Sequence, residues 1–392
     1  MKERDLKKQT AINFLILCPI FLIFSLLLSR WWEGRGMDFG AYWQAGHMVL
    51  SGQNVYDRTQ WETVRQVYKT AFQSGQTFQY PLPLAILFTL PALLPVQTAY
   101  ILWMFFAQIA VLISIIILLS FYPARSGYLE LLAIAGIFFF RPMFSIINSG
   151  QILPFLLLPL AISIWLFHHH KSLAGGFILS ILSLKPSFGF SILILTGVWL
   201  VFRKQWTGLW GMMAGGLVLW IIGALVNPRW IIDYLNVGEN SFRINFGRQP
   251  TLWGAVDKIF VTDSVSLIIG MICVAIVLVM EIYLLWRDKS RVGSLNTFAS
   301  IVSTALLVAP YSWNYDQVLL IVPIIFLLIN ISMRYRTGKA ALFMLGIVVF
   351  AFAMVVVAYS VGHDVWSYLN SVAVWIFSLY FVMKKDQLPC EV

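Results

Sequence analysis

The sequence predicts an all-α polytopic membrane protein that forms a single membrane domain over residues 1–392. Hydrophobic residues make up 60% of the chain and charged residues 11%, whereas a soluble domain carries roughly 45–50% and 25%. The mean hydropathy is +0.81. Apolar runs close to the ~20 residues that cross a bilayer recur along the chain. Together these observations exclude a soluble fold and a disordered chain.

We expect about twelve transmembrane helices. They cover the apolar runs 11–28, 97–120, 128–146, 150–167, 172–184, 187–202, 207–227, 264–286, 297–311, 316–332, 340–359 and 365–383. No small-residue cleavage site follows the first run, which favours an uncleaved span over a signal peptide. Residues 85–94 are apolar but too short to cross, so we expect a re-entrant or interfacial helix there.

The net charge of +10 predicts the orientation of the chain in the membrane. The basic residues cluster in short loops, at Arg125, Lys171, 203–204, 287–291, 334–339 and 384–385. If the twelve runs cross and 85–94 does not, all these loops lie on the side of the N-terminus, which the positive-inside rule places in the cytoplasm. Both termini are then cytoplasmic in a multi-pass protein of the cell membrane. Orientation, rather than nucleic-acid binding, explains the positive charge.

Two long polar segments, 31–96 and 227–263, then lie on the outer side of the membrane. We expect short amphipathic helices in the first segment, over 38–50 and about 57–72. Acids are few in this chain, yet several fall on this side with cations among them, so we assign the chemistry to the outer face. The three cysteines lack a paired spacing and the run 168–170 reads as a polar loop cap, so we expect no disulfide, metal site or cofactor.

Asp38 is the first candidate for catalysis, because a carboxylate beside a membrane span is costly and usually functional. It begins an expected helix, so the alternative is a helix cap, which aspartate favours. Tyr42 lies one turn further along the same helix as a candidate substrate contact. Asp57 reads mainly as the cap of a second helix, with a possible sugar contact.

Several polar residues follow on the expected outer face. Arg141 ends one span, and Asn148 and Gln151 open the next. Amide side chains suit the hydroxyls of a sugar, and arginine suits a phosphate. The alternative is a polar turn that satisfies the two helix ends. Lys185 interrupts an apolar hairpin just before Pro186, as a phosphate contact or as a snorkelling lysine. The other candidates for substrate binding are Arg243, Arg248, Trp313, Asn314, Asp316 and His363.

The order of these motifs resembles glycosyltransferase family 87, a member of the GT-C superfamily of membrane transferases. The resemblance begins with Met37-Asp38-Phe39-Gly40-Ala41-Tyr42-Trp43-Gln44-Ala45-Gly46 and Leu50-Ser51-Gly52-Gln53-Asn54-Val55-Tyr56-Asp57. It continues with Tyr80-Pro81-Leu82-Pro83, Asn148-Ser149-Gly150-Gln151, Lys185-Pro186, Thr251-Leu252-Trp253-Gly254 and Pro310-Tyr311-Ser312-Trp313. The chain has Pro81-Leu82-Pro83 where the family commonly has a Pro-Pro pair, and Asn314-Tyr315-Asp316 where many members carry histidines.

The resemblance implies an inverting, mannosyltransferase-like enzyme with Asp38 as its base. The donor is then a polyprenyl-phosphate sugar, carrying mannose or another hexose or pentose, and the acceptor is a lipid or a glycan. A divalent metal is not required, because the leaving group carries a single phosphate. The alternatives are a flippase or polymerase of lipid-linked glycans and a secondary transporter. A transporter would place its polar residues near the bilayer midplane in broken helices.

Overall fold

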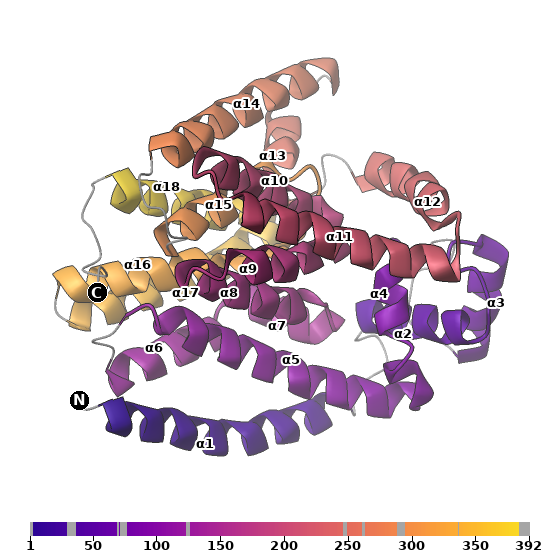
Figure 1. Ribbon diagram of the computed structural model, residues 1–392, viewed down its shortest axis with the longest axis horizontal. Coiled ribbons are helices and arrows are strands. Elements are labelled where there is room, and N and C mark those ends of the chain that lie inside the picture. The colour runs from indigo at the N-terminus through magenta and orange to yellow at the C-terminus, as the bar shows by residue number, and fades with distance from the viewer. Residues whose placement is uncertain are drawn as a thin grey trace.

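The computed structural model describes residues 3–29, 37–68, 70, 77–122, 126–245, 249–260, 263–287, 295–335 and 337–383. Every regular element in these residues is a helix (Figure 1). The all-α prediction is therefore confirmed for the part of the chain that the structure describes.

Each of the twelve apolar runs forms helix, but the helices differ in length. Seven are long and apolar enough to cross a membrane among the described residues. Five of these are the single helices α1 (Glu3–Ser29), α5 (Val96–Leu119), α11 (Trp206–Val226), α14 (Asp263–Arg287) and α17 (Thr337–Val361). The other two join a 3₁₀ turn to a helix, as η3 (Asn314–Leu320) with α16 (Ile321–Arg334) and η4 (Val365–Tyr368) with α18 (Leu369–Met383).

The remaining apolar helices are broken or short. A bend of 56° separates α6 (Gly127–Phe138) from α7 (Arg141–Ser149), and together they make an eighth candidate span. The shorter ones are α8 (Leu153–His168), α9 (Ser172–Leu179) with η2 (Ser180–Leu184), α10 (Pro186–Phe202) and α15 (Leu295–Val308). Because a span needs ~20 residues, the predicted count of twelve transmembrane helices is not confirmed. Buried residues line α8 and almost all of α15, so these helices form the interior of the bundle.

The first long polar segment folds into short helices. They are α2 (Met37–Leu50), α3 (Arg58–Tyr68), α4 (Leu82–Leu87) and η1 (Pro91–Leu93). Neither α4 nor η1 is long enough to cross, as expected for residues 85–94. Whereas α3 buries only Trp61 and Val64, α2 is buried along most of its length. A side chain at Gly46 would meet the carbonyl oxygen of Phe88 at 2.2 Å, so glycine lets α2 lie directly against α4.

The two ends of the molecule differ in chemistry. Helices α2, α3, α4 and α12 (Trp230–Asn245) gather at one end, which we call the polar end, opposite the start of α1 and the end of α18 (Figure 1). At the other end, Arg203 donates to the carbonyl oxygen of Leu285 at 2.8 Å and Arg287 donates to that of Met383 at 3.0 Å. We call this the basic end.

The short α13 (Leu252–Ile259) packs against α14.

Candidate active site

Asp38 lies in the first turn of α2, which begins at Met37. The adjacent Phe39 fixes this turn, since its ring lies 5.4 Å from that of Tyr100 and 5.8 Å from that of Trp103. The end of α7 abuts the same turn. Its last residue is followed by Gly150, which has φ +71°, and a side chain there would lie 2.6 Å from the Cβ of Phe39. This left-handed glycine reverses the chain closely enough to bring Ser149 and Gln151 beside Asp38.

Burial controls the ionisation of Asp38. Its side chain keeps some accessible surface, but desolvation by the surrounding protein raises the pKa of the carboxyl from 3.8 to about 6. Polar interactions with Gln151 and Ser149 and the charge of Lys185 lower this pKa by less than burial raises it. The carboxyl is therefore mostly ionised at pH 7, and its pKa lies in the range that suits a general base.

Gln151 joins Asp38 to a set of buried hydroxyl groups. Its side chain is fully buried, and its Oε1 accepts a hydrogen bond from the hydroxyl of Tyr42 at 2.9 Å. That hydroxyl also lies 3.1 Å from the hydroxyl of Tyr80. Burial raises the pKa values of both tyrosines well above the usual 10, so both remain neutral hydrogen-bond donors. The site therefore holds neutral groups that suit the hydroxyls of a sugar.

Lys185 is buried in an ion pair. Its Nζ lies 2.5 Å from Asp316 Oδ1, and the two residues are 4% and 0% exposed. Asp316 Oδ2 accepts a hydrogen bond from the backbone N–H of Trp313 at 2.7 Å. Lys185 Nζ also lies 3.4 Å from Gln151 Oε1 and 4.6 Å from the centroid of the Tyr315 ring. The ammonium thus has a carboxylate partner within the protein and does not reach toward the membrane surface as a snorkelling lysine does.

Arg141 belongs to a second polar cluster. One of its nitrogens lies 3.1 Å from Asp364 Oδ1, and the amide of Asn314 donates to the other oxygen of Asp364. Arg141 Nη1 and the Nδ1 atom of the neighbouring His363 are buried and have no hydrogen-bond partner among the described residues. Because Asn314 and Asp316 both lie in η3, this cluster adjoins the Lys185 ion pair.

Asp57, Asn148 and the indole of Trp313 take part in none of these hydrogen bonds and ion pairs. Asp57 caps α3, since its Oδ1 accepts from the N–H of Gln60 at 2.8 Å, and Asn148 is exposed. Trp313 donates from its indole nitrogen to the hydroxyl of Tyr311 at 2.8 Å. The side chain of Arg243 and all of Arg248 lie outside the described residues.

The structure also brings into the site residues that the sequence does not single out. Tyr80 and Ser149 lie beside Asp38 and belong to the motifs Tyr80-Pro81-Leu82-Pro83 and Asn148-Ser149-Gly150-Gln151, and Asp364 follows His363 directly. Adjacency to candidate residues is the signal that the sequence contains, but it does not say which neighbour points inward. No group of three or more histidines, cysteines or acids that could hold a metal ion occurs among the described residues.

The fold and this arrangement define a multi-pass helical membrane protein with a carboxylate-centred polar site. A family model described as glycosyltransferase family 87 matches residues 78–310, more than half of the chain, so the chain belongs to that family and is a glycosyltransferase. The matched range includes Gln151 and Lys185, begins after Asp38 and ends before Asp316. No curated protein and no solved structure matches the chain.

Proposed function

We propose that this glycosyltransferase moves a sugar from a polyprenyl-phosphate donor to a lipid or glycan acceptor, with inversion at the anomeric carbon. The observation that carries the proposal is the position of Asp38, a carboxyl with a pKa near 6 beside neutral hydroxyl and amide groups. The sugar is mannose or another hexose or pentose.

The reaction is a single displacement. The acceptor hydroxyl oxygen attacks the anomeric carbon, while the bond between that carbon and the phosphate oxygen breaks on the opposite side. Asp38 takes the proton of the attacking hydroxyl, a contribution of typically ~10²–10⁴-fold in rate. The electron pair of the broken bond leaves with the polyprenyl phosphate. The hydroxyl of Tyr42 and the amide of Gln151 orient the sugar.

The leaving phosphate gains negative charge and needs a preorganised cation. Of the two cations in the site, Arg141 is the better candidate, because its buried Nη1 lacks an acceptor, whereas Lys185 already pairs with Asp316. A buried guanidinium N–H without a partner is costly, and a phosphate oxygen would satisfy it. The role of Lys185 is then to hold Asp316 and Gln151 in place and to favour the ionised form of Asp38.

We assign the reaction to the outer face of the cell membrane, with both termini in the cytoplasm. The support is the separation of the polar end from the basic end, where Arg203 and Arg287 bind neighbouring backbone. Basic loops favour the cytoplasmic side. The bilayer would hold the polyprenyl tail and present the sugar phosphate to the polar end.

The test is incubation of the purified protein with polyprenyl-phosphate sugars and total membrane lipid. We expect a glycosylated product of inverted anomeric configuration, and loss of activity by ~10²–10⁴-fold in Asp38→Asn. Asp57→Asn is the matched control, since asparagine caps a helix as well as aspartate does. Near-full transfer by Asp38→Asn, a retained anomeric configuration, or movement of the lipid-linked sugar across vesicles without transfer would each overturn the proposal.

A further inference from the structure

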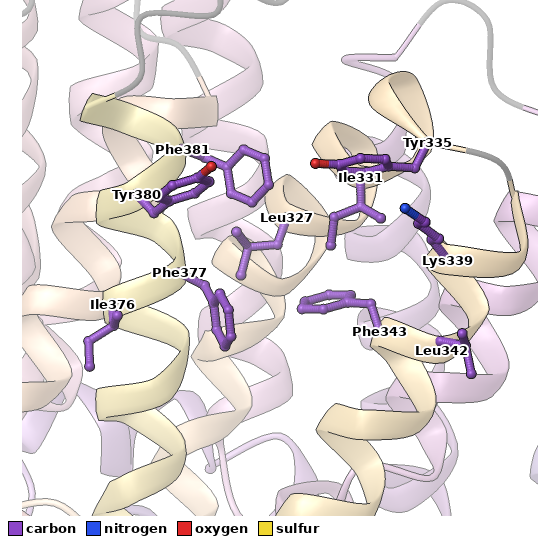
Figure 2. A pocket seen from close by; sticks show the side chains of 10 residues that line it. All are labelled: Leu327, Ile331, Tyr335, Lys339, Leu342, Phe343, Ile376, Phe377, Tyr380 and Phe381. Carbon is purple, nitrogen blue, oxygen red and sulfur yellow. The ribbon is translucent and has the colours of Figure 1, made fainter.

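A groove of about 690 Å³ lies between α16, α17 and α18, away from the residues assigned to glycosyl transfer (Figure 2). Leu327 and Ile331 of α16 form its floor, and Phe343 of α17 and Phe377 of α18 face each other across it. Its volume lies within the ~300–1,000 Å³ of small-molecule sites. The groove opens toward lipid, because Ile376, like Phe377, is about half exposed.

Among the described residues, hydroxyl and charged groups line only one end of the groove, which we call its cationic end. The hydroxyls of Tyr335 and Tyr380 and the ammonium of Lys339 lie at one end, whereas hydrocarbon side chains line the rest (Figure 2). Lys339 is exposed, and its Nζ lies 4.3 Å from the centroid of the Tyr335 ring. The guanidinium of Arg334 lies next to this end, 4.9 Å from the centroid of the Phe381 ring. None of the described residues that line the groove is acidic.

The position of these charged groups in the groove matches the expected orientation of the protein in the membrane. The cationic end of the groove lies where α16 ends and α17 begins, in one of the basic loops that define the expected cytoplasmic side. Lys339 also lies in the first turn of α17, where the helix dipole adds partial positive charge. The hydrocarbon end extends along the same helices away from the loop, about one to two turns by the rise of an α-helix.

We propose that this groove binds one anionic glycerophospholipid from the leaflet at the basic end. An acyl chain occupies the space between Phe343 and Phe377, and the phosphate contacts Lys339. Lipid tails are as apolar as the groove, so burial of the chain gives little preference over the bulk bilayer. Selectivity must therefore come from the charge of the headgroup, and a net negative lipid is favoured over a zwitterionic one.

The experiment uses the full-length protein in nanodiscs that contain a phosphatidylglycerol with a diazirine in one acyl chain. After irradiation, the labelled peptides are mapped by mass spectrometry. We expect label on α17 and α18 around Phe343 and Phe377. Unlabelled phosphatidylglycerol should compete for this label, and phosphatidylcholine should compete roughly fivefold less well, as ~1 kcal/mol for one cation near an anionic surface implies.

Two variants and one control make the assignment specific. Lys339→Gln should weaken labelling about fivefold, and Phe343→Trp should reduce it by filling the groove. Lys171→Gln is the control, because Lys171 is also an exposed lysine over an aromatic ring, 5.7 Å from the centroid of Trp165. It should leave labelling unchanged.

Three results would overturn the proposal. They are label absent from α16, α17 and α18, equal competition by both phospholipids with no effect of Lys339→Gln, and labelling that Phe343→Trp does not reduce. Displacement by a polyprenyl phosphate but not by phosphatidylglycerol would instead assign the groove to the isoprenoid and reject the phospholipid. The readout requires no glycosyl transfer, so it is independent of the proposed function.

Discussion

Replacing Asp38 with asparagine should slow transfer by ~10²–10⁴-fold and at the same time stabilise the protein above pH 6. Burial raises the pKa of the folded carboxyl from 3.8 to about 6. This shift of about two units corresponds to ~3 kcal/mol, at 1.36 kcal/mol per unit. The ionised carboxyl therefore costs the folded state up to about this amount, and the amide does not carry that cost.

The sign of the pH dependence follows from proton binding. Between pH 3.8 and 6 the folded protein holds the Asp38 proton and the unfolded chain does not, so the contribution of Asp38 to stability falls as pH rises through this window. Below pH 3.8 both states are protonated and the contribution disappears. The stability difference between Asp38→Asn and the unmodified protein should therefore grow from about zero near pH 4 to its full size above pH 6.

The measurement pairs thermal unfolding in detergent with transfer activity over pH 4–8. Transfer by the unmodified protein should fall about tenfold per pH unit below pH 6, as expected for a base that must be ionised. Asp57→Asn should change neither property, because Asp57 caps α3 and asparagine caps a helix equally well. A stability difference for Asp38→Asn that is the same at pH 4 and pH 8 would refute the reasoning, as would activity that is constant down to pH 4.

Two further predictions concern packing. Lys185→Met alone should destabilise the protein by ~3–5 kcal/mol, because it leaves Asp316 buried without its cation. The double variant with Asp316→Leu should recover most of this loss. Failure of the double variant to recover stability would show that the ion pair is not the cause. Gly211→Ala should destabilise, since its Cβ would lie 2.0 Å from the carbonyl oxygen of Leu173, whereas Gly216→Ala, with open space around it, should be neutral or slightly stabilising. Equal melting temperatures for the two alanine variants would contradict the close approach of α9 and α11.

The sequence predicts the membrane class and the positions of the twelve apolar runs that form helix, because both depend on composition and run length. It does not predict which runs cross. The four short helices read as spans from their hydropathy alone, yet a helix such as α15 is apolar because it is surrounded by other helices. Length separates these cases only when the true ends are known. The break before Pro186 is the exception, since proline removes a helical hydrogen bond and can break a helix, although α1 and α8 continue through Pro19 and Pro159.

For the candidate site, the sequence selects residue types but not partners. The sequence indicates both Lys185 and Asp316 as candidates, yet 131 positions separate them and no sequence pattern pairs them. The structure changes the chemistry of Lys185 as a result, from a free cation for phosphate to one that is already neutralised. Arg141 shows the opposite case. Its pairing with Asp364 leaves one nitrogen of the guanidinium without an acceptor, which only coordinates can reveal.

The charges of the described site residues give a physical reason for coupling proton transfer to departure of the phosphate. Asp38, Asp316 and Asp364 carry three negative charges when ionised, and Lys185 and Arg141 carry two positive ones, so these residues together hold a net charge of −1. In the proposed reaction Asp38 becomes neutral as the leaving phosphate gains one negative charge. The net charge of these protein residues therefore changes from −1 to 0. Without this change, repulsion between the site and the departing phosphate would increase. Coulomb interactions are stronger in a buried site than in water, so this compensation lowers the barrier most where Asp38 is least solvated. The burial that raises the pKa of Asp38 thus also makes its neutralisation useful to the leaving group.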